Sequence, residues 1–471
     1  MKKNLSIYML TLLLVATSLF TTSCNGFLDN MPKGKKIPTT FTDFEALLRD
    51  EYTNQREDVT QALILLNDRY VSSSSLSYYP LYKANYFWDT SANRVQLNNT
   101  DEGTYYDAYA AISTWNLILE NVNTATGGTD SERKVLAAQC RILRAMDYFM
   151  LVNFYSKTYN EKTADTDGGV PLITSAAVGA SYTQPSVKAI YDFILNDIKE
   201  ALPDLPQKSA TILHPNLGTA YAFAARVYLQ MSDYTDALAY ANQALSCNDS
   251  LFNWPAFYNK NKTVLSNAST YQTITSPMGY DYVENYDFRH GSVIYITTEN
   301  SLRVDRAAKF ETGDAEFMSR WKVRTVGAST YYNSNLSGHF NRGGMTTVEV
   351  YLIKAECLAR TGHVSDAMGV LNTVRKSRIL PEDYADLTAT TEQDAINYIR
   401  TIKDNALILT LMPFADARRY NLETDYARTL SKTENGTNYS LASDSYMWVM
   451  PFPAGAVNNP GNGKITQNVD K

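Results

Sequence analysis

The sequence predicts a mainly α-helical protein whose helical hairpins are interrupted by long loop-rich segments. Two observations carry this prediction. Residues 221–245 and 351–374 share one order of large and small side chains, and the second stretch starts 130 positions (351 − 221) after the first. Residues 72–104 and 248–345 are rich in Tyr, Asn, Ser and Gly and show no helical period, which predicts loops with a few short strands.

Further helices are expected ahead of the first of these stretches. Apolar residues recur at helical spacing through residues 105–122 and again through residues 131–154, with a glycine pair between them. Residues 186–202 have the same spacing and stop at Pro203, which cannot continue a helix. These segments predict additional helical hairpins.

The shared pattern fits two closely packed helices joined by a tight turn. A tyrosine is followed four residues later by Ala225 in one stretch and by Ala355 in the other, and Ala237 and Ala367 hold matching places in the second helix. Small side chains at these places let the two helices approach closely, and the order resembles the tetratricopeptide helix–turn–helix. The helical scaffold is therefore expected over about residues 105–247 and 346–420.

The N-terminus has the three parts of a bacterial secretory signal. Lys2 and Lys3 precede an apolar run over residues 9–20 and a small-residue stretch that ends at Cys24. We expect residues 1–23 to be removed and Cys24 to carry the acyl chains of a permanent membrane anchor. The apolar run is shorter than the roughly 20 residues of a transmembrane helix. A plain signal peptide with a chance cysteine at the cut is the alternative.

Charge and cysteine content narrow the class of protein. The net charge is −6 at pH 7 and becomes −8 (−6 − 2) once the two signal lysines are removed, so nucleic acid is not expected as a partner. The three cysteines after Cys24 are widely separated within apolar helical patterns. We expect Cys140, Cys247 and Cys357 to be buried free thiols and not disulfide partners.

The chain carries no catalytic or metal-binding signature. Its four histidines are isolated, without the spacing of metal ligands, and no nucleophile-elbow pattern occurs. We therefore expect no metal, no cofactor and no enzymatic activity. The 34 tyrosines are the unusual feature, because a ring that also carries a hydroxyl suits wet, stacked recognition surfaces.

Several segments, in order along the whole mature chain, resemble one family. These are residues 24–29 (CNGFLD), 141–160 with GGVPLI at 168–173, 348–378, 411–421 (LMPFADARRYN) and 450–468. Together they resemble the SusD/RagB-like outer-membrane nutrient-binding lipoproteins of the Bacteroidetes, as a single domain over residues 24–471.

The resemblance implies a fold, a location and a partner. The fold is a superhelix of tetratricopeptide-like hairpins with an inserted, loop-rich ligand-binding face. The location is the outer membrane, lipid-anchored and facing the cell exterior. The partner is a SusC-like TonB-dependent transporter, over which the lipoprotein closes as a lid to deliver an oligosaccharide.

Sugar binding needs flat apolar faces, with polar groups at the rim to meet the hydroxyls. Trp88 and Trp321 lie in the loop-rich segments, outside any helical stripe, and we expect both indoles to be exposed. Tyr280 and Tyr286 are weaker candidates. The alternative is that these aromatics cement irregular loops. We expect Trp115 to belong to the core, because it lies in a helical stripe, and Trp448 to pack before the C-terminal motif, while Trp254 resembles a structural position of the family. The remaining candidate ligand residues are Tyr86, Asp89, Asn93, Arg94, Tyr282 and Arg324.

Three functions stay open at this stage. The favoured one is a glycan-binding lipoprotein that serves a transporter. The second is the same fold capturing a peptide or another nutrient. The third is a helical-repeat scaffold for protein interactions, but a scaffold should show a continuous repeat array, whereas a Tyr- and Asn-rich insert separates the two repeats here.

Overall fold

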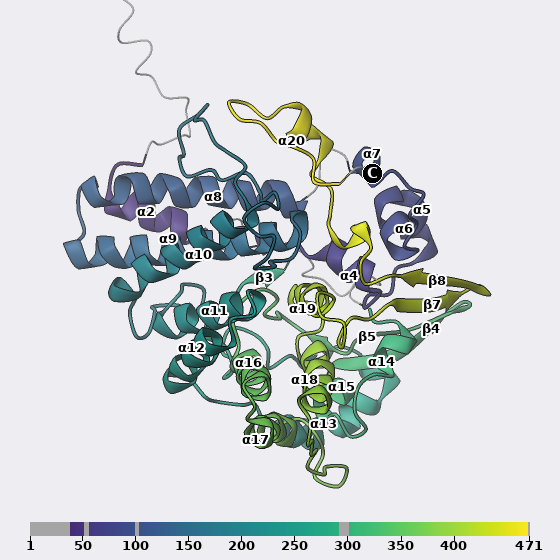
Figure 1. Cartoon of the computed structure of the whole chain (residues 1–471). Helices are drawn as coiled ribbons and strands as arrows, with labels where there is room; N and C mark the ends of the chain where they lie inside the picture. Colours follow the sequence, from purple (N-terminus) through teal and green to yellow (C-terminus); the bar gives the residue numbers. More distant parts are fainter. Residues whose placement is uncertain (1–37, 51–55, 99–102, 292–300, 470–471) are drawn as a thin grey trace, which may run out of the picture.

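The computed structural model describes residues 38–50, 56–98, 103–291 and 301–469. The predicted signal peptide and the predicted lipidation site at Cys24 lie outside these ranges. The described part is mainly helical with a few short strands, as the sequence predicts (Figure 1). None of the described helices is long and apolar enough to cross a membrane.

Three long helices form the first part of the scaffold and confirm the predicted ones. They are α8 (Gly103–Asn121), α9 (Asp130–Tyr155) and α10 (Val187–Ala201). Helix α9 begins at a capping box, in which the Thr129 side chain accepts from the Glu132 backbone and the Glu132 carboxylate accepts from Thr129. The N-terminal helix α2 (Phe41–Leu48) packs on α8 and α9 through Phe44 and Leu48.

The two repeats form helical hairpins that pack against each other. The first is α11 (Leu217–Gln230) with α12 (Tyr234–Cys247), and the second is α16 (Thr347–Arg360) with α17 (Val364–Lys376). Ala225, Ala355, Ala237 and Ala367 are all 0% exposed, which confirms their predicted place between helices. Helix α12 also packs against α16, so the insert between the repeats loops out without separating them in space.

Buried ion pairs tie the hairpins to each other and to the last helices of the scaffold. Arg226 of α11 makes a two-bond pair with Glu349 of α16, with both distances 2.7 Å. Arg419 makes a similar pair with Glu356, at 2.7 and 2.9 Å. Removing one partner of such a pair leaves a buried charge, so these pairs fix the relative position of the helices. Arg419 belongs to α19 (Met412–Tyr420), which follows α18 (Glu392–Ala406).

The segment over residues 72–104 is more helical than predicted. Ser72 caps one short helix through a bond from the Ser75 N–H, and Pro80 begins the next. Helices this short cover too few residues to show a hydrophobic period, which is why the sequence pattern missed them. The helices of this segment are α5 (Ser73–Tyr78), α6 (Pro80–Tyr86) and α7 (Arg94–Leu97), and α4 (Thr60–Leu66) precedes it.

The insert over residues 248–345 contains the predicted short strands but also a helix that the sequence analysis missed. Helix α13 (Trp254–Ser266) is capped by the Asn253 side chain and has Pro255 in its first turn, a start signal we did not use. Two shorter helices follow, α14 (Val304–Ala307) and α15 (Ala315–Arg320).

The strands make small sheets of two strands each. Strands β4 (Trp321–Val326) and β5 (Ser329–Ser334) form an antiparallel hairpin, as do β7 (Leu430–Glu434) and β8 (Thr437–Leu441). The parallel pairs are β1 (Arg56–Glu57) with β3 (His290–Gly291) and β2 (Ile274–Thr275) with β6 (Leu336–Ser337). The chain ends beyond helix α20 (Ala454–Asn458).

The cysteine prediction is correct at two of three positions. Cys140 and Cys357 are buried free thiols, but Cys247 is exposed. Cys247 is the last residue of α12, after the buried stripe that Ala237, Ala241 and Ala244 form, and it is exposed where the helix ends.

Candidate ligand-binding face

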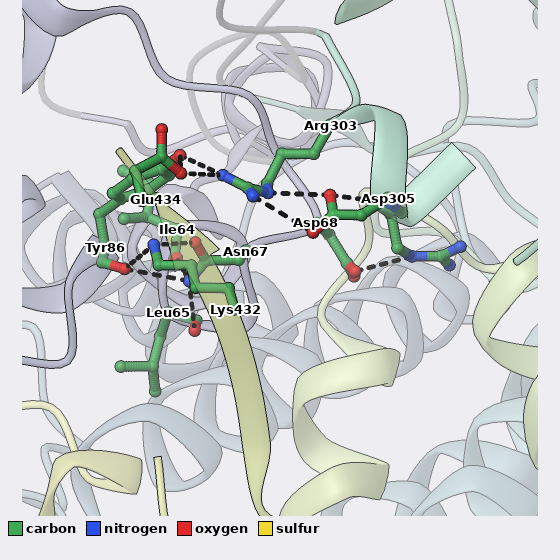
Figure 2. Close-up of polar contacts among 10 residues, drawn as sticks. Ile64, Leu65, Asn67, Asp68, Tyr86, Arg303, Asp305, Lys432 and Glu434 are labelled. Carbon is green, nitrogen blue, oxygen red and sulfur yellow. Dashed lines mark hydrogen bonds and ion pairs between the residues drawn. The ribbon is translucent and has the colours of Figure 1, made fainter. Parts of the chain in front are cut away.

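A polar junction joins three segments that are distant in the sequence (Figure 2). Arg303, the residue before α14, donates to the carboxylate of Glu434 on β7 at 2.8 Å and also to the Tyr86 hydroxyl. The Tyr86 hydroxyl in turn donates to the same Glu434 oxygen at 3.2 Å. Tyr86 is only 2% exposed, so this candidate ligand residue serves to join α6, α14 and β7.

Lys432 lies on the other side of the Tyr86 ring. Its ammonium is 3.3 Å from the ring centroid and donates to the Asn67 side chain and to the Tyr86 carbonyl. Asn67 ends α4 with a positive φ of 57° and donates back to the Tyr86 carbonyl at 3.2 Å (Figure 2). Burial, followed by the nearby Arg303 charge, lowers the pKa of Lys432 to about 7.

Trp88 is buried, contrary to the prediction of an exposed indole. It is 5% exposed, and its indole N–H donates to the Leu65 carbonyl at 2.7 Å. The backbone at Trp88 has a positive φ of 51°, which turns the chain after α6 and directs the ring toward α4. The expectation failed because the absence of a helical stripe does not imply exposure.

The polar residues after Trp88 are engaged in local structure. Arg94 is 0% exposed and donates to the Asn85 side chain and to the carbonyls of Met447 and Val449, at 2.9–3.2 Å. Burial lowers the pKa of Arg94 to about 10. Two bonded partners come from the C-terminal region, so Arg94 fastens that region to α7.

Asp89 and Asn93 lie at the surface and shape turns. Asp89 accepts from both the backbone and the hydroxyl of Ser91, and the hydroxyl bond lowers the pKa of its carboxyl. Asn93 caps α7 by accepting from the Gln96 N–H at 3.0 Å. Asp89 remains exposed, which leaves its carboxylate accessible from solvent.

The second predicted tryptophan is also buried. Trp321 is 4% exposed at the start of β4, and the Arg320 guanidinium lies 5.1 Å from its ring. Tyr282 is 5% exposed and packs in a cluster with Phe252 and Trp254. The exposed-indole expectation is therefore wrong for Trp321 too, and Tyr282 lies within a core cluster. A direct ligand contact by these residues stays a prediction.

Arg324 and three tyrosines form a row along the β4–β5 hairpin. The Arg324 guanidinium lies 3.7 Å from the Tyr271 ring. Tyr331, directly opposite Arg324 across the hairpin, stacks on Tyr70 with centroids 4.5 Å apart and planes within 10°. Arg324, Tyr271 and Tyr70 are half-buried, so parts of this row face solvent. Arg324 thus lies among aromatic rings, and its contact with a ligand stays a prediction.

An exposed aromatic group was not among the predicted site residues. Tyr78 and Tyr79 are 77% and 43% exposed at the end of α5, and Tyr82 follows on α6. The Tyr78–Tyr79 and Tyr79–Tyr82 ring centroids are each 4.7 Å apart. We call Tyr78, Tyr79 and Tyr82 the tyrosine cluster. Its sequence signal is three tyrosines placed on either side of Pro80, where two short helices meet.

The two weaker candidate ligand residues, Tyr280 and Tyr286, differ in how much of their side chains is exposed. Tyr280 is 38% exposed and lies beside His339, with centroids 5.3 Å apart, whereas Tyr286 is 3% exposed and belongs to the core. The tryptophans expected in the core are confirmed there. Trp115 and Trp254 are 0% exposed and Trp448 is 5% exposed.

Figure 1 places α5, α6, the β7–β8 hairpin and the β4–β5 hairpin on one flank, away from the hairpins α11–α12 and α16–α17. Within the described ranges, no group of three or more His, Cys, Asp or Glu side chains is arranged to hold a metal ion. This flank carries the exposed rings of Tyr78 and Tyr79 and the half-buried Arg324.

Comparisons with known proteins show which sequences and structures this chain is similar to. Residues 26–229 match a SusD-like family model described as "Starch-binding associating with outer membrane". SusD-like protein P2 of Formosa agariphila is 30% identical over 162 residues, which is 31% of this chain and 29% of that protein. The matched stretch thus spans less than a third of that relative.

Solved structures extend the similarity to nearly the whole chain at the level of fold. A SusD superfamily protein from Bacteroides thetaiotaomicron matches 91% of this chain and 100% of its own, with a TM-score of 0.69 and 14% identity. Surface glycan-binding protein A from Bacteroides uniformis matches 91% of this chain and 99% of its own, with a TM-score of 0.68 and 15% identity.

Proposed function

We propose that this chain, which matches a SusD-like family model over residues 26–229 and shares its fold with SusD superfamily structures, is a lipid-anchored outer-membrane protein that captures an oligosaccharide and delivers it to a SusC-like TonB-dependent transporter. The family model is described as starch-binding and associated with the outer membrane, and one structural relative is named a surface glycan-binding protein. These names describe binding, and we propose binding without catalysis. Cys24 supplies the anchor in this proposal.

The tyrosine cluster is the observation that supports glycan capture most directly. A sugar ring presents a flat C–H face that stacks on an aromatic ring, and its hydroxyls bond to polar groups at the edge. Tyr78 and Tyr79 combine both features, since each has an exposed ring and a hydroxyl at its tip. Tyr78 lies against Tyr79, and Tyr79 lies against Tyr82, so the exposed rings are contiguous, and a contiguous exposed aromatic group favours a recognition role.

Removing the cluster tests this function. The soluble chain starting at Asn25 is screened against glycans, and the ligand found is titrated calorimetrically. Tyr78→Ala and Tyr79→Ala should each weaken binding while the melting temperature stays unchanged. The variant with the larger effect should lose about 2 kcal/mol of binding free energy, or roughly thirtyfold in affinity. Tyr398→Ala is the matched control, because Tyr398 is 39% exposed on α18, outside this face.

Three outcomes would redirect the proposal. Equal affinity in the cluster variants and the control would exclude the cluster from the site. Binding lost only in Trp88→Ala or Trp321→Ala proteins that remain folded would return the site to the tryptophans. Binding of peptides, with no glycan bound in the screen, would support nutrient capture of another kind.

The anchor has its own test. Cys24→Ala removes the acylated residue, so the protein should leave the membrane fraction and lose labelling by a fatty-acid analogue. Unchanged labelling and membrane association in the variant would contradict the anchor while leaving glycan binding open.

A further inference from the structure

A small cavity lies where the loop-rich insert meets the N-terminal end of α16. Its volume is about 30 Å³, and its wall includes Tyr282, Thr346 and several arginines. A buried water needs about 10–15 Å³, so the cavity has room for about two waters or one ion of chloride size. It is far smaller than the roughly 300 Å³ or more of a ligand pocket, so a sugar does not fit.

The wall of this cavity carries more positive than negative groups. Its two carboxylates are both paired with arginines of the same wall. Glu349 accepts two bonds from Arg226, each 2.7 Å long, and Glu284 lies 3.5 Å from Arg378. Arg320 pairs with Glu316, 3.2 Å away. The wall arginines are Arg226, Arg320, Arg342 and Arg378.

Arg342 is the wall arginine without a carboxylate in the described part of the chain. Its Nη1 atom is buried and makes no hydrogen bond there, and its guanidinium lies 5.3 Å from the Phe340 ring. Arg320 lies 5.4 Å from the same ring. Burial, with repulsion from Arg320 and Arg69, lowers the pKa of Arg342 to about 9. Arg342 as a residue is half-buried, but a guanidinium nitrogen that is buried without a hydrogen-bond partner is costly unless a counter-ion accepts from it.

The end of α16 adds a second source of positive potential. Thr346 precedes the helix, yet its hydroxyl does not cap it and has no hydrogen-bond partner in the described ranges, although the atom is buried. The first-turn residues Val348 and Glu349 also line the cavity. The N-terminus of a 14-residue helix attracts anions through its free N–H groups and its dipole.

Arg342 is held in this position by a rigid turn. The Asn341 side chain donates to the Asp287 carbonyl at 2.7 Å and accepts from the Gly344 N–H at 2.9 Å. A Cβ at Gly344 would lie 2.4 Å from the Asp287 carbonyl oxygen, so only glycine fits this turn. Arg342 is therefore presented to the cavity by a turn that cannot easily move it away.

We propose that this cavity binds one monatomic anion of chloride size, which neutralises Arg342 and joins the insert to the N-terminus of α16. The buried Nη1 of Arg342 without a hydrogen-bond partner, the uncapped helix end and the cavity volume all lead to this ligand. The site is separate from glycan capture and does not depend on it. Its expected effect is on the attachment of the insert to the scaffold.

Crystallography in bromide tests the site directly. Crystals of the soluble chain grown or soaked in sodium bromide should show an anomalous peak in the cavity, within about 3.5 Å of the Arg342 guanidinium nitrogens. Water alone at this position, with no anomalous peak, would overturn the proposal.

A thermal measurement gives an independent readout. At constant ionic strength, replacing gluconate with chloride should raise the melting temperature by about 2–4 °C, because an anion bound only to the folded state stabilises it. Arg342→Met should abolish this dependence, and Arg342→Lys should retain part of it. Arg324→Met, outside the cavity, is the control and should keep the wild-type dependence. Equal melting temperatures of the wild-type chain in both salts would also overturn the proposal.

Discussion

Tyr78 and Tyr86 lie eight positions apart in one tyrosine-rich stretch, and they have opposite environments. Tyr78 is 77% exposed and contacts Tyr79 beside it, whereas Tyr86 is 2% exposed and is enclosed by Arg303, Glu434 and Lys432. Composition and helical spacing do not separate the two residues. The difference comes from the β7 strand, whose Lys432 contacts Tyr86 from 346 positions further along the chain.

This comparison shows what a tyrosine-rich segment can and cannot indicate. The segment over residues 72–104 does belong to the face with exposed aromatic groups, as its composition indicates. Which rings are accessible depends on segments that return from far along the sequence and cover some rings and not others. A tryptophan that lies outside a helical stripe is therefore no better a ligand candidate than a tyrosine, because the sequence does not show which distant segments pack over it.

The largest expected difference between covered and uncovered aromatics is in stability. Trp88→Ala removes a buried ring and its bond to the Leu65 carbonyl, and should lower the free energy of unfolding by about 3–5 kcal/mol. Tyr78→Ala should change it by less than about 0.5 kcal/mol. Denaturant titration of the soluble chain measures both. Similar losses in the two variants would show that Tyr78 is also structurally required.

A smaller effect is expected in the scaffold, where the sequence pattern alone placed the residues correctly. Ala225→Leu and Ala355→Leu insert bulk into filled helix contacts and should each cost about 1–3 kcal/mol. Ala239→Leu is the control, because Ala239 is exposed on α12. If all three variants melt like the wild type, the two repeat alanines are not at a tight contact.

The scaffold could be predicted because its information is local and repeated. The alanine at 225 and its counterpart at 355 need only the residues of their own hairpins to show where two helices touch. Even the turn matches, since Ser232 and Gly362 both have positive φ, 62° and 85°, at equivalent positions. Helix α13 was missed because a polar, tyrosine-containing helix has a weak apolar stripe, although Asn253 and Pro255 signal its start.

The sequence could not show which side chains of the candidate site are exposed, because distant segments bury some of them. Arg94 resembles a rim residue in sequence, but its partners Met447 and Val449 lie more than 350 positions away. Sequence position alone could not show that these carbonyls would enclose it. Arg324 is only half-buried, although it pairs with the buried Tyr331 across the hairpin and lies on the Tyr271 ring, so it remains a surface candidate.

The smallest expected effect is a pH dependence of stability that comes from Lys432, the residue that packs on the buried Tyr86. Lys432 has a folded-state pKa of about 7, whereas an unfolded lysine titrates near 10.4. Between these values the unfolded chain binds the proton and the folded chain does not, so stability should rise with pH. From pH 7 to pH 8 the gain in the free energy of unfolding is about 1 kcal/mol.

The Lys432→Met variant should lose this increment. The Lys376→Met variant should keep it, because Lys376 is an exposed lysine on α17. Unfolding free energies of the three proteins at both pH values measure the increment. The same increment in Lys432→Met as in the wild type would show that another group causes it, and that the amine over the Tyr86 ring stays charged.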